Sequence, residues 1–298
     1  MVDISVIIAS YNTSELTIQS VNTAALALEA SLLKWEIIVV DNASTDDSLA
    51  KLTEYVKGEQ FPITILENNV NVGFGAANNI AIARSTGEFI LLLNSDTIVD
   101  NVHFDKLIAF AREQTDFGGL TVKLLLSDGS IDPACHRGFP TPWRSFCYMS
   151  GLEKLTNNVP SLKPLFGGYH LTHLPLDEAH QIDTPSGAFF LMKKVVFDAA
   201  GGFDEQFFMY GEDIDLAYRI HKMGKSIWYR PEQSITHLKG QSGMQRTDMS
   251  QNTRQHFYQA MKIFYQKHYE ELYPTFLNQL IYKAIDYKLA KPQGQPNS

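Results

Sequence analysis

The clearest candidate for chemistry in the sequence is a carboxylate, Asp96, that follows an apolar run. Residues 89–93 (FILLL) have the continuous apolar character of a buried strand, and Asn94, Ser95 and Asp96 form its polar end. Hard divalent cations prefer oxygen ligands, and one or two carboxylates suffice where phosphate oxygens and water complete the coordination. Asp96 is therefore a candidate ligand for Mg²⁺ or Mn²⁺, although the same pattern fits a cap for a following helix.

A second acidic group is the pair Glu212 and Asp213, at the predicted start of a helix over residues 212–223. A carboxylate within hydrogen-bond reach can accept the proton of a hydroxyl as that hydroxyl attacks an electrophilic carbon. Acids in the first turn of a helix also stabilise its dipole. The pair is thus a candidate general base, with helix stabilisation as the alternative.

These residues need a scaffold, and the first hundred residues indicate one by alternating strand-like and helix-like blocks. The strand-like runs are continuously apolar, which is typical of parallel strands covered on both faces. We therefore predict an α/β fold with a doubly wound, mostly parallel sheet. In such sheets ligands bind beyond the carboxyl ends of the strands, so residues 9–12, 41–42 and 94–96 should meet at one edge. The predicted strands are 4–10, 35–41, 63–67 and 88–93, and the predicted helices are 14–33, 46–56, 73–84 and 103–114.

The second half of the chain is less regular. Residues 127–181 are rich in proline, and we interpret them as a loop-rich insertion that could act as a lid. Order returns at residues 184–194, a short strand is predicted at 226–229, and the chain beyond residue 248 is helix-like and aromatic. We expect a catalytic domain at 1–245, with halves at 1–125 and 126–245, and a C-terminal helical segment and tail at 246–298.

Composition limits the class of protein. The chain has 298 residues, 44% hydrophobic and 19% charged, with a formal net charge of -8. This permits a sizeable core and gives no support for polyanion binding, so we expect no nucleic-acid partner. Cys135 and Cys147 match neither a disulfide framework nor a paired-cysteine zinc site. Since no basic leader and no bilayer-length apolar run is present, we expect a cytoplasmic protein.

Four segments in this order and spacing resemble the family 2 glycosyltransferases of the GT-A (nucleotide-diphospho-sugar transferase) fold, close to their rhamnosyltransferase-like branch. The resemblance covers about residues 3–240 and rests on 6–12 (VIIASYN), 39–46 (VVDNASTD), 93–96 (LNSD) and 208–216 (FMYGEDIDL). It implies a metal-dependent, inverting hexosyltransferase that uses a dTDP- or UDP-sugar with Mg²⁺ or Mn²⁺. Cell-surface polysaccharide synthesis is the implied setting.

The resemblance implies roles on the donor side. The family binds its metal through an Asp-x-Asp segment; here Asn94 replaces the first aspartate, so one carboxylate is missing while Asp96 keeps the more important position. Ser95 belongs to the same donor-binding segment. The family places a histidine as a second metal ligand where His237 stands.

Further donor contacts follow from the same resemblance. Asp41 is expected at the base or ribose, because a carboxylate suits the imide N–H of uracil or thymine, with a helix cap as the alternative. Ala9 and Tyr11 should line the same pocket. Gly73 opens a glycine-rich helix start that could approach donor phosphate; it lacks the third glycine of a dinucleotide fingerprint, so NAD binding is rejected. Arg84 resembles a basic donor contact, or is a surface charge.

On the acceptor side, the resemblance makes Asp213 the general base and Glu212 a group that orients hydroxyls. Asp215 should point elsewhere. Ser186 and Gly187, in a turn before a strand, should border the acceptor.

Two cations, Lys239 and Arg246, could close over the diphosphate as its charge grows. The Gln-x-x-Arg-Trp segment of processive synthases is not reproduced nearby, which indicates transfer of a single sugar.

Several alternatives stay open at this stage. The acceptor is a saccharide or a lipid-linked saccharide, and the C-terminal aromatic and basic helices could rest peripherally on the inner face of the plasma membrane, pack on the catalytic domain or form a homo-oligomer. Asn94 also leaves room for a lapsed enzyme that serves as a binding or scaffold protein. A sugar nucleotidyltransferase is disfavoured, because residues 10–13 lack the glycine-rich, basic loop that such enzymes require after the first strand.

Overall fold

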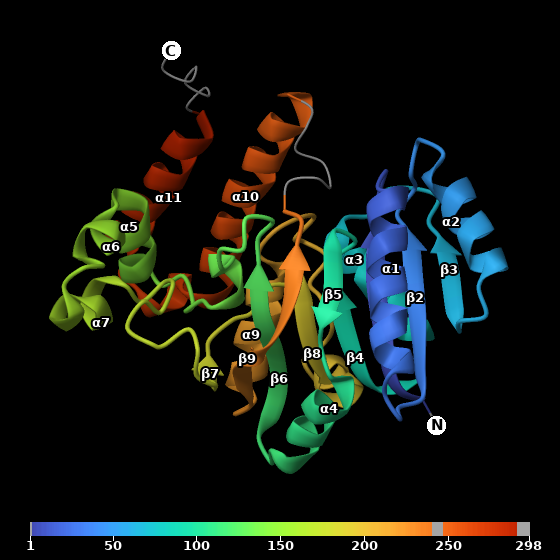
Figure 1. Ribbon diagram of the computed structural model, residues 1–298. Coiled ribbons are helices and arrows are strands. Elements are labelled where there is room, and N and C mark those ends of the chain that lie inside the picture. Colours follow the sequence, from blue (N-terminus) through green and yellow to red (C-terminus); the bar gives the residue numbers. More distant parts are fainter. Residues whose placement is uncertain (1, 240–246, 291–298) are drawn as a thin grey trace.

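The computed structural model describes residues 2–239 and 247–290. Within this part of the chain, nine strands form one sheet in the order β3-β2-β1-β4-β8-β6-β9-β5, with β7 paired to β9 (Figure 1). The strands are β1 (Val2–Ser10), β2 (Trp35–Asp41), β3 (Ile63–Glu67), β4 (Gly87–Leu93), β5 (Thr97–Asn101), β6 (Phe117–Leu125), β7 (His180–Ile182), β8 (Phe189–Lys193) and β9 (Ser226–His237).

Helices lie on both faces of this sheet (Figure 1). The α-helices are α1 (Ser14–Glu29), α2 (Ser48–Gly58), α3 (Phe74–Arg84), α4 (Phe104–Glu113), α5 (Pro142–Ser150), α6 (Leu152–Thr156), α7 (Lys163–Phe166), α8 (Lys194–Ala199), α9 (Glu212–Lys222), α10 (Thr247–His268) and α11 (Thr275–Ala290). Short 3-10 turns are η1 (Pro133–Cys135), η2 (Pro160–Leu162) and η3 (Glu270–Leu272).

The N-terminal half confirms the predicted parallel sheet. Strands β1 to β4 pair in parallel, and β2 and β3 begin and end where the apolar runs predict. The parallel pairing aligns Ser10 with Asp41. As expected, the polar residues after these strands therefore lie along one edge.

The C-terminal half differs from the prediction. β9 runs on to His237 instead of ending at residue 229. Its pairing with β6 shifts register around Pro231 and then resumes at Ser234, so the proline interrupts the sequence pattern without ending the strand. β5 and β6 were not predicted from the sequence. Residues 127–181 contain the short helices α5, α6 and α7 between turns.

The C-terminal helices pack against α9 and the segment before it through a cluster separate from the main core. Phe207 joins Phe264, Tyr265 and Tyr269 of α10 there. The carboxylate of Asp215, on α9, lies 2.7 Å from His268 Nε2 and 2.9 Å from Lys267 Nζ. Asp215 thus anchors α10 and points away from the acids at the start of α9, as expected. Among the described helices, none combines the length and apolarity that a membrane crossing requires.

Candidate active site

The pairing of β5 with β9 brings Asp96 and His237 together. Thr97 lies opposite His237 in this antiparallel ladder, and the N–H of Leu238 donates to the carbonyl of Asp96 over 2.8 Å. His237 Nε2 is 3.3 Å from Asp96 Oδ1, and both residues are buried. β5 follows Asp96 directly and the cap of α4 is His103, so the helix-cap interpretation of Asp96 is wrong.

A third residue, Asp132, orients this histidine and was missed in the sequence. Its buried carboxylate lies 3.0 Å from His237 Nδ1 and accepts from the Lys239 ammonium at 3.0 Å. It also accepts the N–H of Ala134 at 3.0 Å, which fixes η1. Asp132 sits in the irregular segment after β6, where no periodicity marks it.

Electrostatics in this group favour charged forms. Burial opposes the charge of His237, yet its hydrogen bonds to Asp132 and Asp96 outweigh burial and raise its pKa to about 9. Burial likewise opposes the charge of Asp132, but His237, the Ala134 N–H and Lys239 hold its pKa well below the usual range. Asp132 is therefore an anion that steers the Nδ1 side of the ring, leaving Nε2 directed at Asp96.

The donor set at this point suits a divalent cation that is shared with a phosphate. Two ligands of one octahedral Mg²⁺ or Mn²⁺ are about 3 Å apart, close to the separation of Asp96 Oδ1 and His237 Nε2. Across residues 2–239 and 247–290, no group of three or more His, Cys, Asp or Glu side chains is arranged to hold a metal. Oxygens from a ligand would have to complete the coordination. Asn94 Nδ2 lies 3.5 Å from His237 Nε2, in place of the missing carboxylate.

The residue expected at the donor base, Asp41, lies at the same edge of the sheet. Its Oδ2 accepts the N–H of Ser44 at 2.9 Å, while its buried Oδ1 has no hydrogen-bond partner in the described structure. The helix-cap alternative fails, since the cap of α2 is Asp47. Ala9 precedes the last residue of β1, in register with β2, and half-buried Tyr11 follows that strand. An N–H donor on a ligand would satisfy Asp41.

The two other expected donor contacts, Gly73 and Arg84, lie at opposite ends of α3. Gly73 has φ of 88°, and a Cβ there would stand 2.4 Å from the carbonyl oxygen of Phe208, so close packing explains this glycine. Arg84 is the last residue of α3, exposed and near the start of β4, at the edge opposite the carboxyl ends of the parallel strands. The structure does not bring Arg84 to the site, because the length of α3 separates its two ends.

The acids of α9 meet a buried arginine, Arg137, which no sequence pattern marked as a site residue. Its guanidinium lies 2.9 Å from Asp213 Oδ2 and donates to the carbonyl of Pro185 at 2.6 Å. The N–H of Gly187 points to the same Asp213 oxygen at 3.3 Å, and the N–H of Ile214 donates to Oδ1 at 2.8 Å. Asp213 is thereby held at one orientation.

The neighbouring Glu212 has a different environment. Its Oε2 is buried without a hydrogen-bond partner among the described residues. Burial, with the adjacent charge of Asp213, raises the pKa of Glu212 well above its usual value. The Arg137 guanidinium lies beside Asp213, so the penalty of burial falls mainly on a charged Glu212.

The loop at residues 184–188 connects the two acidic groups. The N–H of Asn94 donates to the carbonyl of Ala188 at 3.3 Å, and Gly187 contacts Asp213. The Ser186 hydroxyl accepts the N–H of Ala188 at 3.2 Å and so shapes the turn. The loop therefore sets the spacing between the Asp96 side and the Asp213 side.

The remaining expected residues are placed as follows. Ser95 is buried and its hydroxyl accepts from Thr13 at 3.5 Å. Lys239 pairs with Asp132, and its side chain remains nearly half exposed. Arg246 lies outside the described residues.

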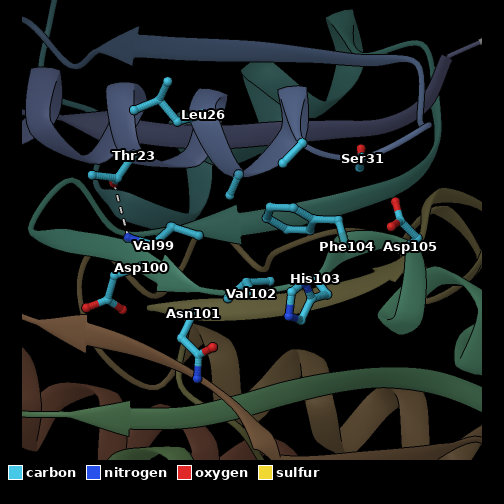
Figure 2. Close-up of a pocket in the computed structure, with 12 residues that line it drawn as sticks. Thr23, Leu26, Ser31, Val99, Asp100, Asn101, Val102, His103, Phe104 and Asp105 are labelled. Carbon is cyan, nitrogen blue, oxygen red and sulfur yellow. Dashed lines mark hydrogen bonds between the residues drawn. The ribbon is translucent and has the colours of Figure 1, made fainter.

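A separate cavity of about 340 Å³ lies between the C-terminal half of α1 and the segment from β5 to α4 (Figure 2). Thr23 there accepts the N–H of Val99 at 3.1 Å. Its lining includes Asp100 and Asp105 but neither the candidate metal ligands nor the acids of α9. β5 carries the chain away from Asp96 toward this cavity, so the cavity is not the candidate active site.

Comparisons with known proteins agree with this geometry. Residues 5–154 match the model of glycosyl transferase family 2. The chain is 28% identical over 218 residues to N-acetylglucosaminyl-diphospho-decaprenol L-rhamnosyltransferase of Mycobacterium tuberculosis, covering 69% of this chain and 67% of the relative. It is 25% identical over 228 residues to poly-beta-1,6-N-acetyl-D-glucosamine synthase of Staphylococcus epidermidis, covering 76% of this chain and 48% of that relative.

Among solved structures, GalNAc-T7 with UDP, GalNAc and Mn²⁺ superposes with a TM-score of 0.60 at 17% identity, covering 99% of this chain and 52% of that one. At this identity the likeness shows the fold alone. The sheet, the ordered motifs and the family match together establish that this chain is a member of glycosyl transferase family 2 with the GT-A fold.

Proposed function

We propose that this protein is an inverting glycosyltransferase that moves one sugar from a nucleotide diphosphate sugar to an acceptor hydroxyl during synthesis of a bacterial cell-surface polysaccharide. The observation that carries this proposal is the loop at residues 184–188, which contacts Asn94 on one side and Asp213 on the other. A donor held near Asp96 would then present its sugar to an acceptor beside Asp213.

In the proposed reaction, the acceptor oxygen forms a bond to the anomeric carbon from the face opposite the leaving group. The bond between that carbon and the phosphate oxygen breaks, and its electron pair leaves with the nucleoside diphosphate. Asp213 takes the proton of the acceptor hydroxyl, and Glu212 orients hydroxyls nearby. Because the attacking oxygen becomes acidic only as its new bond forms, a carboxylate already paired with Arg137 is basic enough.

Asp96 and His237 would hold a divalent cation against the donor diphosphate, with the cation replacing the proton that Asp96 stabilises on Nε2 of His237. Such an ion supplies Lewis-acid stabilisation of the departing phosphate. Asp132 supports this assignment, since metal-binding histidines commonly donate their other N–H to a carboxylate. The Mn²⁺ in the GalNAc-T7 structure fits the same expectation. Lys239 would contact the diphosphate once it exchanges Asp132 for phosphate.

The donor base that best suits the site is uracil or thymine. Asp41 Oδ1 is buried and unpartnered in the described structure, and an imide N–H would satisfy it. UDP in the GalNAc-T7 structure agrees with this choice. Rhamnose as the sugar and a lipid-linked saccharide as the acceptor are proposed from the printed name of the mycobacterial relative.

A lipid-linked acceptor would require contact with a membrane surface, which we propose to be peripheral and cytoplasmic. α11 exposes Phe276 and Leu280, and α5 exposes Trp143 and Phe146. Exposed aromatic and aliphatic side chains of this kind can enter the headgroup region of a bilayer. Association of two copies through these faces is the alternative.

Release of nucleoside diphosphate tests the proposed function. Purified protein is mixed with a panel of dTDP-, UDP- and GDP-sugars, with Mn²⁺, Mg²⁺ or EDTA, and with membrane lipid extract as a source of acceptor. We expect metal-dependent turnover of one uracil or thymine donor, abolished in Asp96→Ala and retained in Asp198→Asn, whose carboxylate is exposed on α8. Turnover that EDTA leaves unchanged would contradict the metal assignment.

A catalytically lapsed binding protein is the second candidate, favoured by Asn94 standing where the family has a carboxylate. For such a protein, calorimetry would show metal-dependent nucleotide binding, and the release assay would show no turnover of any donor. Turnover in the same preparation would exclude it.

A further inference from the structure

The buried guanidinium of Arg137 needs an explanation beyond packing. It comes from the segment between β6 and α5, far in sequence from the acids of α9, and its side chain is only 12% exposed. Burying a cation is costly unless it is paired, and its main carboxylate partner is Asp213 at 2.9 Å.

The backbone fixes where this guanidinium can reach. The N–H of Thr184 donates to the carbonyl of Arg137 at 3.0 Å, forming a bridge next to the loop at residues 184–188. The side chain then donates to Pro185, one residue further along that loop. Arg137 is thus tied by main chain and side chain to the loop that contacts Asp213.

The charged and titratable groups facing Asp213 explain what this pairing does. They are the Arg137 guanidinium, the carboxyl of Glu212 and the phenol of Tyr169, which interacts with Arg137. Two adjacent carboxyls in a buried place cannot both be charged cheaply. A cation beside only one of them decides which acid carries the charge.

We propose that Arg137 is a positioning residue for sugar transfer: it places its positive charge beside Asp213, rather than Glu212, and fixes Oδ2 of Asp213 against the acceptor loop. This inference rests on the proposed function. It assigns a role to the segment between β6 and α5, which would tune the general base from outside the acidic pair of α9.

The test compares Arg137→Met and Arg137→Lys with the matched variant Arg144→Met. Arg144 lies on the helix that follows, α5, and pairs with Asp183 at 2.6 Å instead of with Asp213. For each protein we would measure kcat and donor KM across pH, binding of UDP with Mn²⁺ by calorimetry, and the melting temperature.

We expect Arg137→Met to lower kcat by about 100-fold, the scale of general base catalysis, while UDP binding and donor KM change by less than about threefold. The acid limb of its rate profile should move to higher pH, because a carboxylate without its cation gains a proton more readily. Arg137→Lys should recover part of kcat and restore the limb, since it keeps the charge without the guanidinium fork.

The possible outcomes distinguish a failure of the proposed function from a failure of the role assigned to Arg137. A wild-type protein that turns over no donor would overturn the proposed function and this inference with it. A working wild type whose Arg137→Met variant keeps its kcat and acid limb, or matches Arg144→Met in both, would overturn this inference alone. If Arg137→Met does not fold, Arg137→Lys decides: a folded variant with unchanged kcat and acid limb counts against the inference, and a lowered kcat with intact UDP binding supports it.

Discussion

His237 Nδ1 and the carboxylate of Asp132 lie 3.0 Å apart in a buried pair that directs the opposite ring nitrogen to Asp96. This relationship makes the orientation of a candidate metal ligand depend on a residue from another part of the fold.

Replacing Asp132 with Asn should weaken metal binding without removing a ligand. The amide cannot supply the negative charge that orients His237, and loss of such a supporting carboxylate typically costs about 10- to 100-fold in metal affinity. Titration of Mn²⁺ in the presence of UDP, followed by electron paramagnetic resonance, measures this. Asp128→Asn, exposed in the turn just before Asp132, is the control and should bind as the wild type does. Equal affinity in both variants would refute the role of Asp132.

Replacing Asp41 with Asn should weaken binding of uracil nucleotides by about tenfold or more, because a charged acceptor facing an imide N–H is lost. CDP, whose ring N3 carries no hydrogen, should lose no affinity. Calorimetry with UDP and CDP in the presence of Mn²⁺ checks both values. A variant that keeps its full affinity for UDP would show that Asp41 does not contact the base.

Glu212 gives a pH-dependent contribution to stability. Its pKa is raised by burial and by Asp213, so the folded protein holds this proton to higher pH than the unfolded chain, whose value is near 4.5. Where the native state binds more protons, stability falls as pH rises, so this contribution declines from about pH 4.5 upward. Glu212→Gln lacks the titration. The melting temperature of the variant, relative to that of the wild type, should therefore rise between about pH 5 and about pH 8. A difference in melting temperature that stays constant over this range would contradict the assignment.

Gly73→Ala should destabilise the protein at the start of α3. The added methyl would meet the Phe208 carbonyl at 2.4 Å, in a backbone conformation with φ of 88°. Strain of this kind costs about 1–3 kcal/mol or more. Gly58→Ala is the control, since nothing lies within 4 Å of its would-be Cβ. Urea unfolding of the two variants compares them, and equal midpoints would refute the packing explanation.

The sequence predicted the N-terminal half of the site well because continuous apolar runs mark parallel strands and their polar ends. Asp41 and Asp96 could be placed at one edge on that basis alone. His237 was selected by resemblance, and its approach to Asp96 depends on the β5–β9 ladder, which Pro231 hid from the strand pattern.

Other residues could not be found this way. Asp132 and Arg137 lie in an irregular, proline-rich segment whose contacts are set by tertiary packing and not by periodicity. Arg84 was expected near the donor, but α3 carries it to the opposite edge of the sheet. For Asp132 and Arg137 the missing information was a long-range contact that no local pattern contains, whereas for Arg84 it was the length of α3.

The most direct test of the central claim separates the roles of Asp96 and Asp213 in one preparation. For the wild type, Asp96→Ala and Asp213→Asn, we would measure metal-dependent binding of the donor nucleotide and the rate of sugar transfer. The account predicts that Asp96→Ala loses both, whereas Asp213→Asn keeps nucleotide binding and loses about 100-fold or more in rate. An Asp213→Asn variant that transfers sugar at the wild-type rate would contradict it.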